Sequence, residues 1–259
     1  MINAQNLPST PGPDERLDRV NHAITLLQKK NGHLFSTDAL LLAGYLPALP
    51  VQSMAAELGS GSGIVSLLAL ARDKVPEIDA FELQEEYAAL TARNAARNGF
   101  SDRLHTFCAD VREECRARHD RYRLVFANPP YLPAGGRENA DPGKHAARHE
   151  CFGGIAAFTA AAGKMLSTGG LFTVVCRPDR TVDLLAAMRS ADLEPKRLTL
   201  VRPTPSAAPC LLLAEGKKGA KPSLYLTPVF SLKGEDGRDS EEYRFLLETG
   251  SFPPVYMKK

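Results

Sequence analysis

The sequence predicts an α/β fold built on a doubly wound, mostly parallel sheet of seven strands. Three observations lead to this prediction. Short apolar segments alternate with helical segments between residues 51 and 190, a glycine-rich turn follows the first of them, and the last third passes directly from strand to strand. Repeated strand–helix units favour a parallel sheet with helices on both faces, and the strand–strand passage favours an antiparallel final hairpin.

Length sets the domain organisation that we expect. A chain of 259 residues is long enough for one large α/β domain with a small extension. We expect residues 1–17, which are polar and rich in proline, to form a flexible arm. Residues 18–259 then form a single domain, in which residues 18–50 are a short N-terminal extension.

Net charge, apolar runs and cysteine content limit which functions and which cellular compartment the sequence is compatible with. The formal net charge of +2 is too small to indicate a nucleic-acid-binding protein, so any site for a polyanion depends on local clusters. No apolar run approaches the ~18 residues that span a bilayer, and the N-terminus lacks the apolar core of a signal peptide. Five widely spaced cysteines without a C-x-x-C pair predict a reducing compartment, no disulfide framework and no metal site. We therefore expect a cytoplasmic protein that does not bind a membrane.

The N-terminal extension is expected to hold a hairpin and a helix. Residues 20–35 resemble a short hairpin that returns through Asn31-Gly32, a strong two-residue turn signal. Ser36 or Thr37 can cap the helix predicted over residues 38–46.

The first half of the α/β region predicts four strands. They cover residues 51–58, 78–83, 104–109 and 122–127. Helices over residues 63–72 and 85–98 connect the first three strands, and Gly99 closes the second helix. A polar loop over residues 132–150 follows the fourth strand.

The second half predicts one more strand–helix unit and then the hairpin. A helix over residues 155–166 ends at Thr168-Gly169-Gly170, before a fifth strand over residues 171–176 and a helix from Pro178 to about Ser190. The remaining predicted elements are strands at 197–201, 210–214 and 224–232 and a helix at 240–247.

The glycine-rich turn predicts a cofactor loop. Glu57-x-Gly59-x-Gly61-x-Gly63 lies where the first strand ends and a helix begins, and glycines let the backbone approach a ligand closely. Its spacing differs from the G-x-G-x-x-G of dinucleotide-binding folds, which makes a nicotinamide cofactor the weaker alternative. A cofactor without phosphates, such as S-adenosylmethionine, needs less anion capture and more room for an amino-acid tail.

Two further acids end the next two strands. Glu82 lies ~20 residues after the loop, as expected of a carboxylate that accepts ribose hydroxyls, and Asp110 can accept the amine hydrogens of an adenine. Glu57 has two possible roles, because it can contact the cofactor or fix the loop by accepting backbone amides. From the sequence we assign the following residues to the cofactor: Glu57, Gly59, Ser60, Gly61, Gly63, Glu82, Leu83, Asp110, Val111 and Asn128.

The tetrapeptide Asn128-Pro129-Pro130-Tyr131 closes the apolar run of the fourth strand and carries the predicted chemistry. Neither proline can donate to a sheet ladder, so the strand stops there. The Asn128 amide and the Pro129 carbonyl can accept the two hydrogens of a planar NH2 group, and Tyr131 can stack on a flat partner. We predict these four residues as the catalytic set.

These motifs resemble the class I methyltransferases of the N-P-P-Y type, and most closely the bacterial tRNA1(Val) adenosine-37 N6-methyltransferase family. The resemblance covers roughly residues 18–250. It includes the segment from Gly32 to Leu42, similar to a G-x-x-F-x-x-D-x-L-L-L element, and a second motif running from Glu82 through Asn94 and Asn98 to Gly99.

The resemblance implies a Rossmann-like sheet with a reversed final strand, S-adenosylmethionine as cofactor and methyl transfer to an adenine N6 in tRNA. It also implies that Phe35, Ser36 and Asp38 lie over the methionine end of the cofactor. The loop after the tetrapeptide departs from the family pattern, because it is longer and contains Asp141.

Other functions share the same motif. An N5-glutamine methyltransferase of a release factor presents a side-chain amide with the same two hydrogens, but the segment before Glu57 is too short for that family's helical substrate domain. A ribosomal-RNA guanine-N2 methyltransferase commonly has a duplicated or extended domain, which this chain lacks. A non-catalytic RNA-binding module would not need the glycines, Glu82 and Asn128.

Basic residues at three places are candidates for RNA contact. We predict that Arg137, Lys144 and Arg148 in the 132–150 loop bind substrate together with Tyr131, and that the loop acts as a lid. The pair Lys29-Lys30 and the cluster of Lys217, Lys218 and Lys221 are explained equally well as solvated surface. His145 and His149 have no obvious third ligand for a metal.

Overall fold

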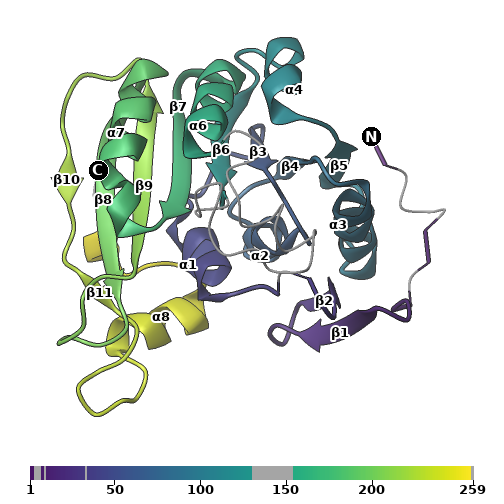
Figure 1. Cartoon of the computed structure of the whole chain (residues 1–259), viewed down its shortest axis with the longest axis horizontal. Helices are drawn as coiled ribbons and strands as arrows, with labels where there is room; N and C mark the ends of the chain where they lie inside the picture. The colour runs from purple at the N-terminus through teal and green to yellow at the C-terminus, as the bar shows by residue number, and fades with distance from the viewer. Residues whose placement is uncertain (3–6, 9, 33, 130–153, 258–259) are drawn as a thin grey trace.

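A single large mixed sheet forms the centre of the protein in the computed structural model. The structure describes residues 1–2, 7–8, 10–32, 34–129 and 154–257. The strand order of the sheet is β10-β8-β9-β7-β6-β3-β4-β5, with β11 also paired to β8 (Figure 1). The strands are β3 (Met54–Leu58), β4 (Glu77–Glu82), β5 (Leu104–Cys108), β6 (Tyr122–Ala127), β7 (Leu166–Cys176), β8 (Leu193–Arg202), β9 (Leu211–Lys218), β10 (Tyr225–Leu226) and β11 (Phe230–Ser231). Of the seven long strands, β9 pairs antiparallel with both neighbours and the rest run parallel, which confirms the predicted fold class.

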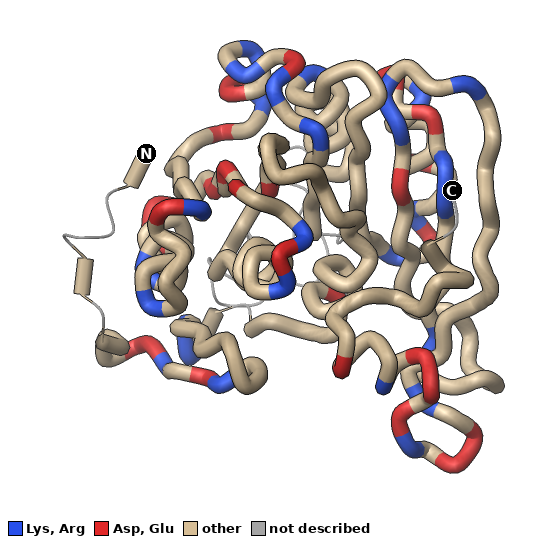
Figure 2. Tube along the Cα trace, turned by 180° about the vertical axis from the view of Figure 1, so that it is seen from behind, with Lys and Arg blue, Asp and Glu red and all other residues tan. Residues whose placement is uncertain are grey.

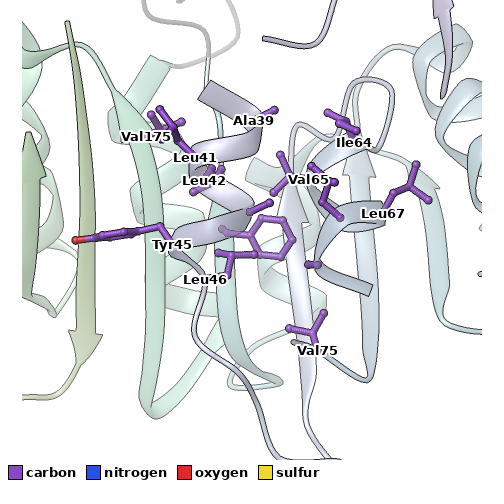
Figure 3. Close-up of a cluster of buried hydrophobic side chains, with 14 of the residues drawn as sticks. Ala39, Leu41, Leu42, Tyr45, Leu46, Ile64, Val65, Leu67, Val75 and Val175 are labelled. Carbon is purple, nitrogen blue, oxygen red and sulfur yellow. The ribbon is translucent and has the colours of Figure 1, made fainter. Parts of the chain in front are cut away.

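Helices cover both faces of this sheet and produce two apolar clusters. The helices of one face are α1 (Thr37–Tyr45), α2 (Ile64–Ala71) and α3 (Glu85–Arg97), and those of the other are α4 (Val111–Ala117), α6 (Gly154–Met165) and α7 (Thr181–Ser190) (Figure 1). Figure 3 shows Ile64 and Val65 of α2 on one side of α1, and Leu41 with Val175 and the Tyr45 ring on the other. The last helix, α8 (Glu241–Thr249), packs on β11. Within the described residues, no helix is both long and apolar enough to cross a bilayer.

Two buried cations close the C-terminal end of α1. The last carbonyls of a helix lack partners within the helix, and cations are favoured there. Lys74 Nζ donates to the carbonyls of Ala43, Gly44 and Leu46 at 2.9, 2.7 and 3.1 Å. Arg197 of β8 donates to the Tyr45 carbonyl at 3.2 Å and forms an ion pair with Glu215 at 2.8 Å. Four consecutive carbonyls are thus satisfied from elsewhere in the chain, and we call this set the α1-end network.

The N-terminal hairpin differs from the prediction. Strand β2 (Thr25–Lys29) pairs antiparallel with β1 (Glu15–Arg19), which precedes it, so the turn lies between Arg19 and Thr25. The prediction that the hairpin returns through Asn31-Gly32 is wrong: those residues do form a turn, closed by the Gly32 amide and the Lys29 carbonyl at 3.3 Å, but it joins no second strand. The hairpin turn is closed by Asn21 Oδ1, which accepts from the amides of Ala23 and Ile24. Residues 15–17 consequently belong to a strand, where the sequence predicted part of a flexible arm.

Other differences come from local chemistry. Helix α4 was not predicted, because its sequence is polar and only Val111 and Cys115 are buried. β7 starts five residues before the predicted strand, since a register shift opposite Tyr122 to Leu124 accommodates Gly169-Gly170. The strand predicted at 224–232 is two short strands with Pro228 between them. The 132–150 loop lies within residues 130–153, outside the described residues.

Candidate active site

The candidate site lies at the point where the strand order reverses. From β3 the chain proceeds to β4 and β5 on one side, and β6 and β7 lie on the other. Leu58 at the end of β3 pairs with Phe81 of β4 and with Ala127 of β6. The glycine loop and Asn128 therefore leave adjacent parallel strands at the same level, which is the position where doubly wound sheets bind ligands.

The loop glycines are required for two different reasons. Gly59, Gly61 and Gly63 all have positive φ, at 72°, 56° and 80°. A Cβ on Gly63 would lie 2.9 Å from Thr91 Cγ2, and one on Gly59 would lie 3.1 Å from the Phe158 ring, so these two are also fixed by packing. A Cβ on Gly61 would meet no described atom within 4 Å. As far as the described residues go, Gly61 therefore presents an open face that a ligand can approach.

Glu57 faces helix α2, which follows the loop. Its buried carboxylate accepts from the Ser66 amide at 3.2 Å and from the Ser66 hydroxyl. Burial raises the pKa of Glu57 to about 8, which the bonds from Ser66 partly oppose. The contacts tie Glu57 to the first turn of α2, directly after the loop, and both roles given to Glu57 stay predictions.

Glu82 joins the loop to the end of β4. One carboxylate oxygen accepts from the Gly61 amide at 2.9 Å and the other from the Gln84 amide at 3.0 Å. Burial raises the pKa of this group as well. The carboxylate is held at the predicted ribose position by backbone donors and retains further lone pairs for hydroxyl groups.

Asp110 lies just after β5, where it caps helix α4, and the exposed apolar side chain of Leu83 follows the neighbouring strand β4. Asp110 caps α4 by accepting from the Arg112 amide at 2.9 Å and forms an ion pair with the Arg112 guanidinium. The Arg112 hydrogen bonds hold the pKa of Asp110 below its ordinary value. Leu83 is 38% exposed at the neighbouring strand end, and Val111 is buried. An adenine between these residues remains a prediction.

The catalytic tetrapeptide is described only in its first half. Asn128 follows β6 directly and is half-buried, and Pro129 is buried. Pro130 and Tyr131 lie outside the described residues, as do Arg137, Lys144 and Arg148 of the predicted substrate set. The structure thus brings Asn128 and Pro129 beside the glycine loop at the switch point.

The segment before α1 is tied to the hairpin. The Phe35 amide donates to Gln28 Oε1 of β2 at 2.7 Å, and the half-buried Phe35 ring packs against the apolar core. Ser36 is the N-cap of α1 without a side-chain capping bond, and Asp38 lies in the first turn.

The topology separates the basic clusters. Lys217 pairs with Leu171 near the start of β7. The cluster of Lys217, Lys218 and Lys221 therefore lies where the parallel strands begin, at the end of the sheet opposite to the glycine loop. Lys218 there binds Asp120 at 2.7 Å. Lys29 lies on the loop side and pairs with Asp14 and Glu86. Figure 2 shows basic and acidic residues interspersed along the described trace.

Sequence reasoning gave no role to three polar residues that hold the site, although Asn94 belongs to the motif that runs from Glu82 to Gly99. Thr91 donates to the Gly61 carbonyl at 2.8 Å, and Asn94 donates to the Ser62 carbonyl at 2.9 Å. Gln28 binds the Phe35 amide, as described above. The signal available in the sequence is the presence of Thr91 and Asn94 at i,i+3 on α3, where a helix packed on a sheet normally places apolar residues.

Comparison with known proteins decides the family. The family model described as methyltransferase small domain matches residues 33–190. The chain belongs to this family. Family membership confirms that it is a methyltransferase and that S-adenosylmethionine is its cofactor. The open face of Gly61, the anchored Glu82 carboxylate and exposed Leu83 fit such a cofactor.

Curated relatives and solved structures agree with this assignment. A protein of Flavobacterium johnsoniae named tRNA1(Val) (adenine(37)-N6)-methyltransferase is 27% identical over 70% of this chain and 76% of its own length. An Enterobacter protein of the same name is 33% identical over 56% of this chain, and the match spans only 58% of that protein. A solved structure of a predicted O-methyltransferase from Agrobacterium tumefaciens superposes with a TM-score of 0.68 at 21% identity, covering 83% of this chain and 98% of its own. That likeness establishes the shared fold.

Proposed function

We propose that this methyltransferase transfers a methyl group to the exocyclic N6 of an adenine in the anticodon loop of a tRNA. The observation that carries the proposal is the position of Asn128 and Pro129, which follow β6 at the switch point beside the glycine loop. The names of the curated relatives support adenine N6 in tRNA as the target.

The chemistry follows from the groups at the strand end. The lone pair of an aryl amine is delocalised into its ring, so the amine is a poor nucleophile. When Asn128 Oδ1 accepts one amine hydrogen and the Pro129 carbonyl accepts the other, electron density rises on the nitrogen and its lone pair is turned out of the ring plane. Positioning and directed hydrogen bonds of this kind contribute several kcal/mol.

Bound S-adenosylmethionine supplies a methyl group on a sulfonium, so charge is neutralised as the methyl leaves. With the cofactor bound, Asn128 and Pro129 would direct the nitrogen lone pair toward that methyl group, and the proton that the nitrogen loses on methylation would pass to solvent. Glu82 orients the ribose, and Glu57 keeps the loop backbone in place through Ser66. Phe35, Ser36 and Asp38 lie over the methionine end in this proposal.

The remaining contacts belong to the substrate. Tyr131 stacks on the target base, which must be unpaired, and Arg137, Lys144 and Arg148 contact phosphates. Such contacts give affinity that falls with added salt. A tRNA substrate also places the protein in the cytoplasm.

One labelling experiment tests the proposal. The protein is incubated with labelled cofactor and separate pools of tRNA, ribosomal RNA and release factor, and each product is digested and identified. We expect label in N6-methyladenosine from tRNA. Label in glutamine or in N2-methylguanosine would overturn the assignment.

The role of Asn128 has its own test. Asn128→Ala should lower methyl transfer by about 100-fold or more and cofactor affinity far less, because the variant loses an acceptor that acts on the nucleophile. Binding is measured by calorimetry and transfer by label incorporation. Near-full activity of this variant would contradict the mechanism.

A further inference from the structure

We propose that Asn94 is a positioning residue that fixes the spacing between two walls of the cofactor site. One wall is the glycine loop, and the other is the Phe35 segment before α1. The inference rests on the cofactor assigned above and extends it to a residue of α3 that has no place in the proposed chemistry.

Asn94 contacts the loop and the hairpin at the same time. Its side chain is fully buried. Nδ2 donates to the Ser62 carbonyl at 2.9 Å and to the Leu27 carbonyl at 3.0 Å, and Oδ1 accepts from the Leu27 amide at 2.7 Å. Asn94 therefore pairs with β2 as a neighbouring strand would, and uses its second amide hydrogen to hold the glycine loop.

The next residue of β2 continues the connection. Gln28 is buried, and its Oε1 accepts from the Phe35 amide at 2.7 Å while its Nε2 donates to Asp18 at 2.6 Å. A continuous path runs from Ser62 through Asn94, Leu27 and Gln28 to the backbone of Phe35. Movement of the hairpin relative to α3 would change the distance between the two walls.

The first strand of the hairpin is also bonded to α3. Arg93, adjacent to Asn94, forms a buried ion pair with Glu15 of β1, with two bonds of 2.7 and 2.8 Å. The Arg93 hydrogen bonds lower the pKa of Glu15, so the pair is charged at neutral pH. Both strands of the hairpin are thus bonded to α3, β1 through Arg93 and β2 through Asn94.

Asn98 provides a matched control in the same helix. It also pairs with β2, since Oδ1 accepts from the Thr25 amide at 3.0 Å and Nδ2 donates to the Thr25 carbonyl at 2.8 Å. Its other bond to a described residue goes to the Asn94 carbonyl, and none goes to the glycine loop. Asn94→Asp and Asn98→Asp each keep the acceptor and lose the donor, but only the first releases Ser62.

The test compares cofactor affinity with turnover. By calorimetry, Asn94→Asp should weaken S-adenosylmethionine binding about tenfold or more, and Asn98→Asp by less than about threefold. At saturating cofactor, methyl transfer by Asn94→Asp should stay within about threefold of the parent, because the substrate-facing groups are unchanged. Met188→Ala, which loses buried packing in α7, controls for lowered stability alone. Equal cofactor affinity of the two aspartate variants would overturn the proposal.

A second measurement on the unaltered protein covers the case in which Asn94→Asp does not fold. Coupling between sites is reciprocal, so S-adenosylhomocysteine should slow amide hydrogen exchange in β1 and β2 by about threefold or more. Exchange in α7 serves as the reference. Unchanged exchange in the hairpin would show that it is not coupled to the cofactor site. Failure of the tRNA proposal alone would leave both of these binding readouts intact.

Discussion

The glycine-loop region and the α1-end network both bury charged side chains, but the acids of the first bind backbone amides and the bases of the second bind backbone carbonyls. In the glycine-loop region, Glu57 and Glu82 accept from backbone amides of residues 61–84. In the α1-end network, Lys74 and Arg197 donate to helix carbonyls. The first arrangement holds a loop around a ligand, whereas the second closes a helix against the core. Buried polar residues therefore indicate a binding site only where the backbone they hold has an open face, as Gly61 does.

The largest effect is expected from Arg197→Met in the α1-end network. The variant loses the bonds to Glu215, Tyr45 and Tyr256, and breaking a buried ion pair typically costs about 3–5 kcal/mol. Denaturant unfolding measures the loss, and cofactor affinity of the folded fraction should not change. Arg197→Met combined with Glu215→Leu should recover part of the stability. A large loss of affinity in the single variant would remove the distinction between the two regions.

Lys74 should give the α1-end network its own pH dependence. Burial lowers the pKa of Lys74 to about 7 from an ordinary value of 10.5, so the unfolded chain binds more protons between these values. The free energy of unfolding should therefore rise with pH from 7 to 10.5, by at most about 1.4 kcal/mol per unit. Lys74→Met should flatten this slope in unfolding curves measured across the range. An unchanged slope would mean that Lys74 is not its source.

Glu57 should give the glycine-loop region a dependence of opposite sign. Its pKa is raised to about 8 from 4.5, so the folded state binds more protons between these values. The contribution of Glu57 to the free energy of unfolding should be greatest below pH 4.5. It should fall as the pH rises to 8, by less than about 1.4 kcal/mol per pH unit. Glu57→Gln keeps an acceptor for Ser66 and should remove the slope. If the variant instead loses stability at pH 8, the carboxylate is the better partner there.

A smaller loss of stability is expected from alanine at two glycines, and the pair separates the cost of a steric contact from the cost of a positive φ. Gly63→Ala and Gly99→Ala both place a Cβ on a residue with positive φ, at 80° and 75°, which costs about 1–2 kcal/mol in each. Only the first also brings a Cβ to 2.9 Å from Thr91, so it should lose about 1 kcal/mol more, together with cofactor affinity. Thermal unfolding with and without cofactor measures both quantities. Equal behaviour of the two variants would show that Thr91 moves aside without cost.

The sheet and the strand-end residues were predictable because each depends on local sequence. Apolar strands alternating with helices define the parallel sheet. Gly59, Glu82 and Asn128 lie at the carboxyl ends of three of these strands, which meet at the same end of the sheet. The hairpin was mispredicted because the turn at Asn21 was overlooked in favour of Asn31-Gly32. The contacts of β2 with Asn94 and Asn98 could not be predicted, since these residues lie far away in sequence. Likewise, the partners of Lys74 and Lys218 come from distant parts of the chain, and residue type alone does not predict them.

The two short strands beside β8 have a consequence for solubility. An uncovered sheet edge offers unpaired amides and carbonyls to other chains. β10 and β11 occupy that edge of β8 with two residues each, and Pro228 between them cannot donate to a further strand. The segment from Tyr225 to Ser231 thus blocks pairing of another chain with this edge of β8, and its removal should expose the edge to intermolecular pairing.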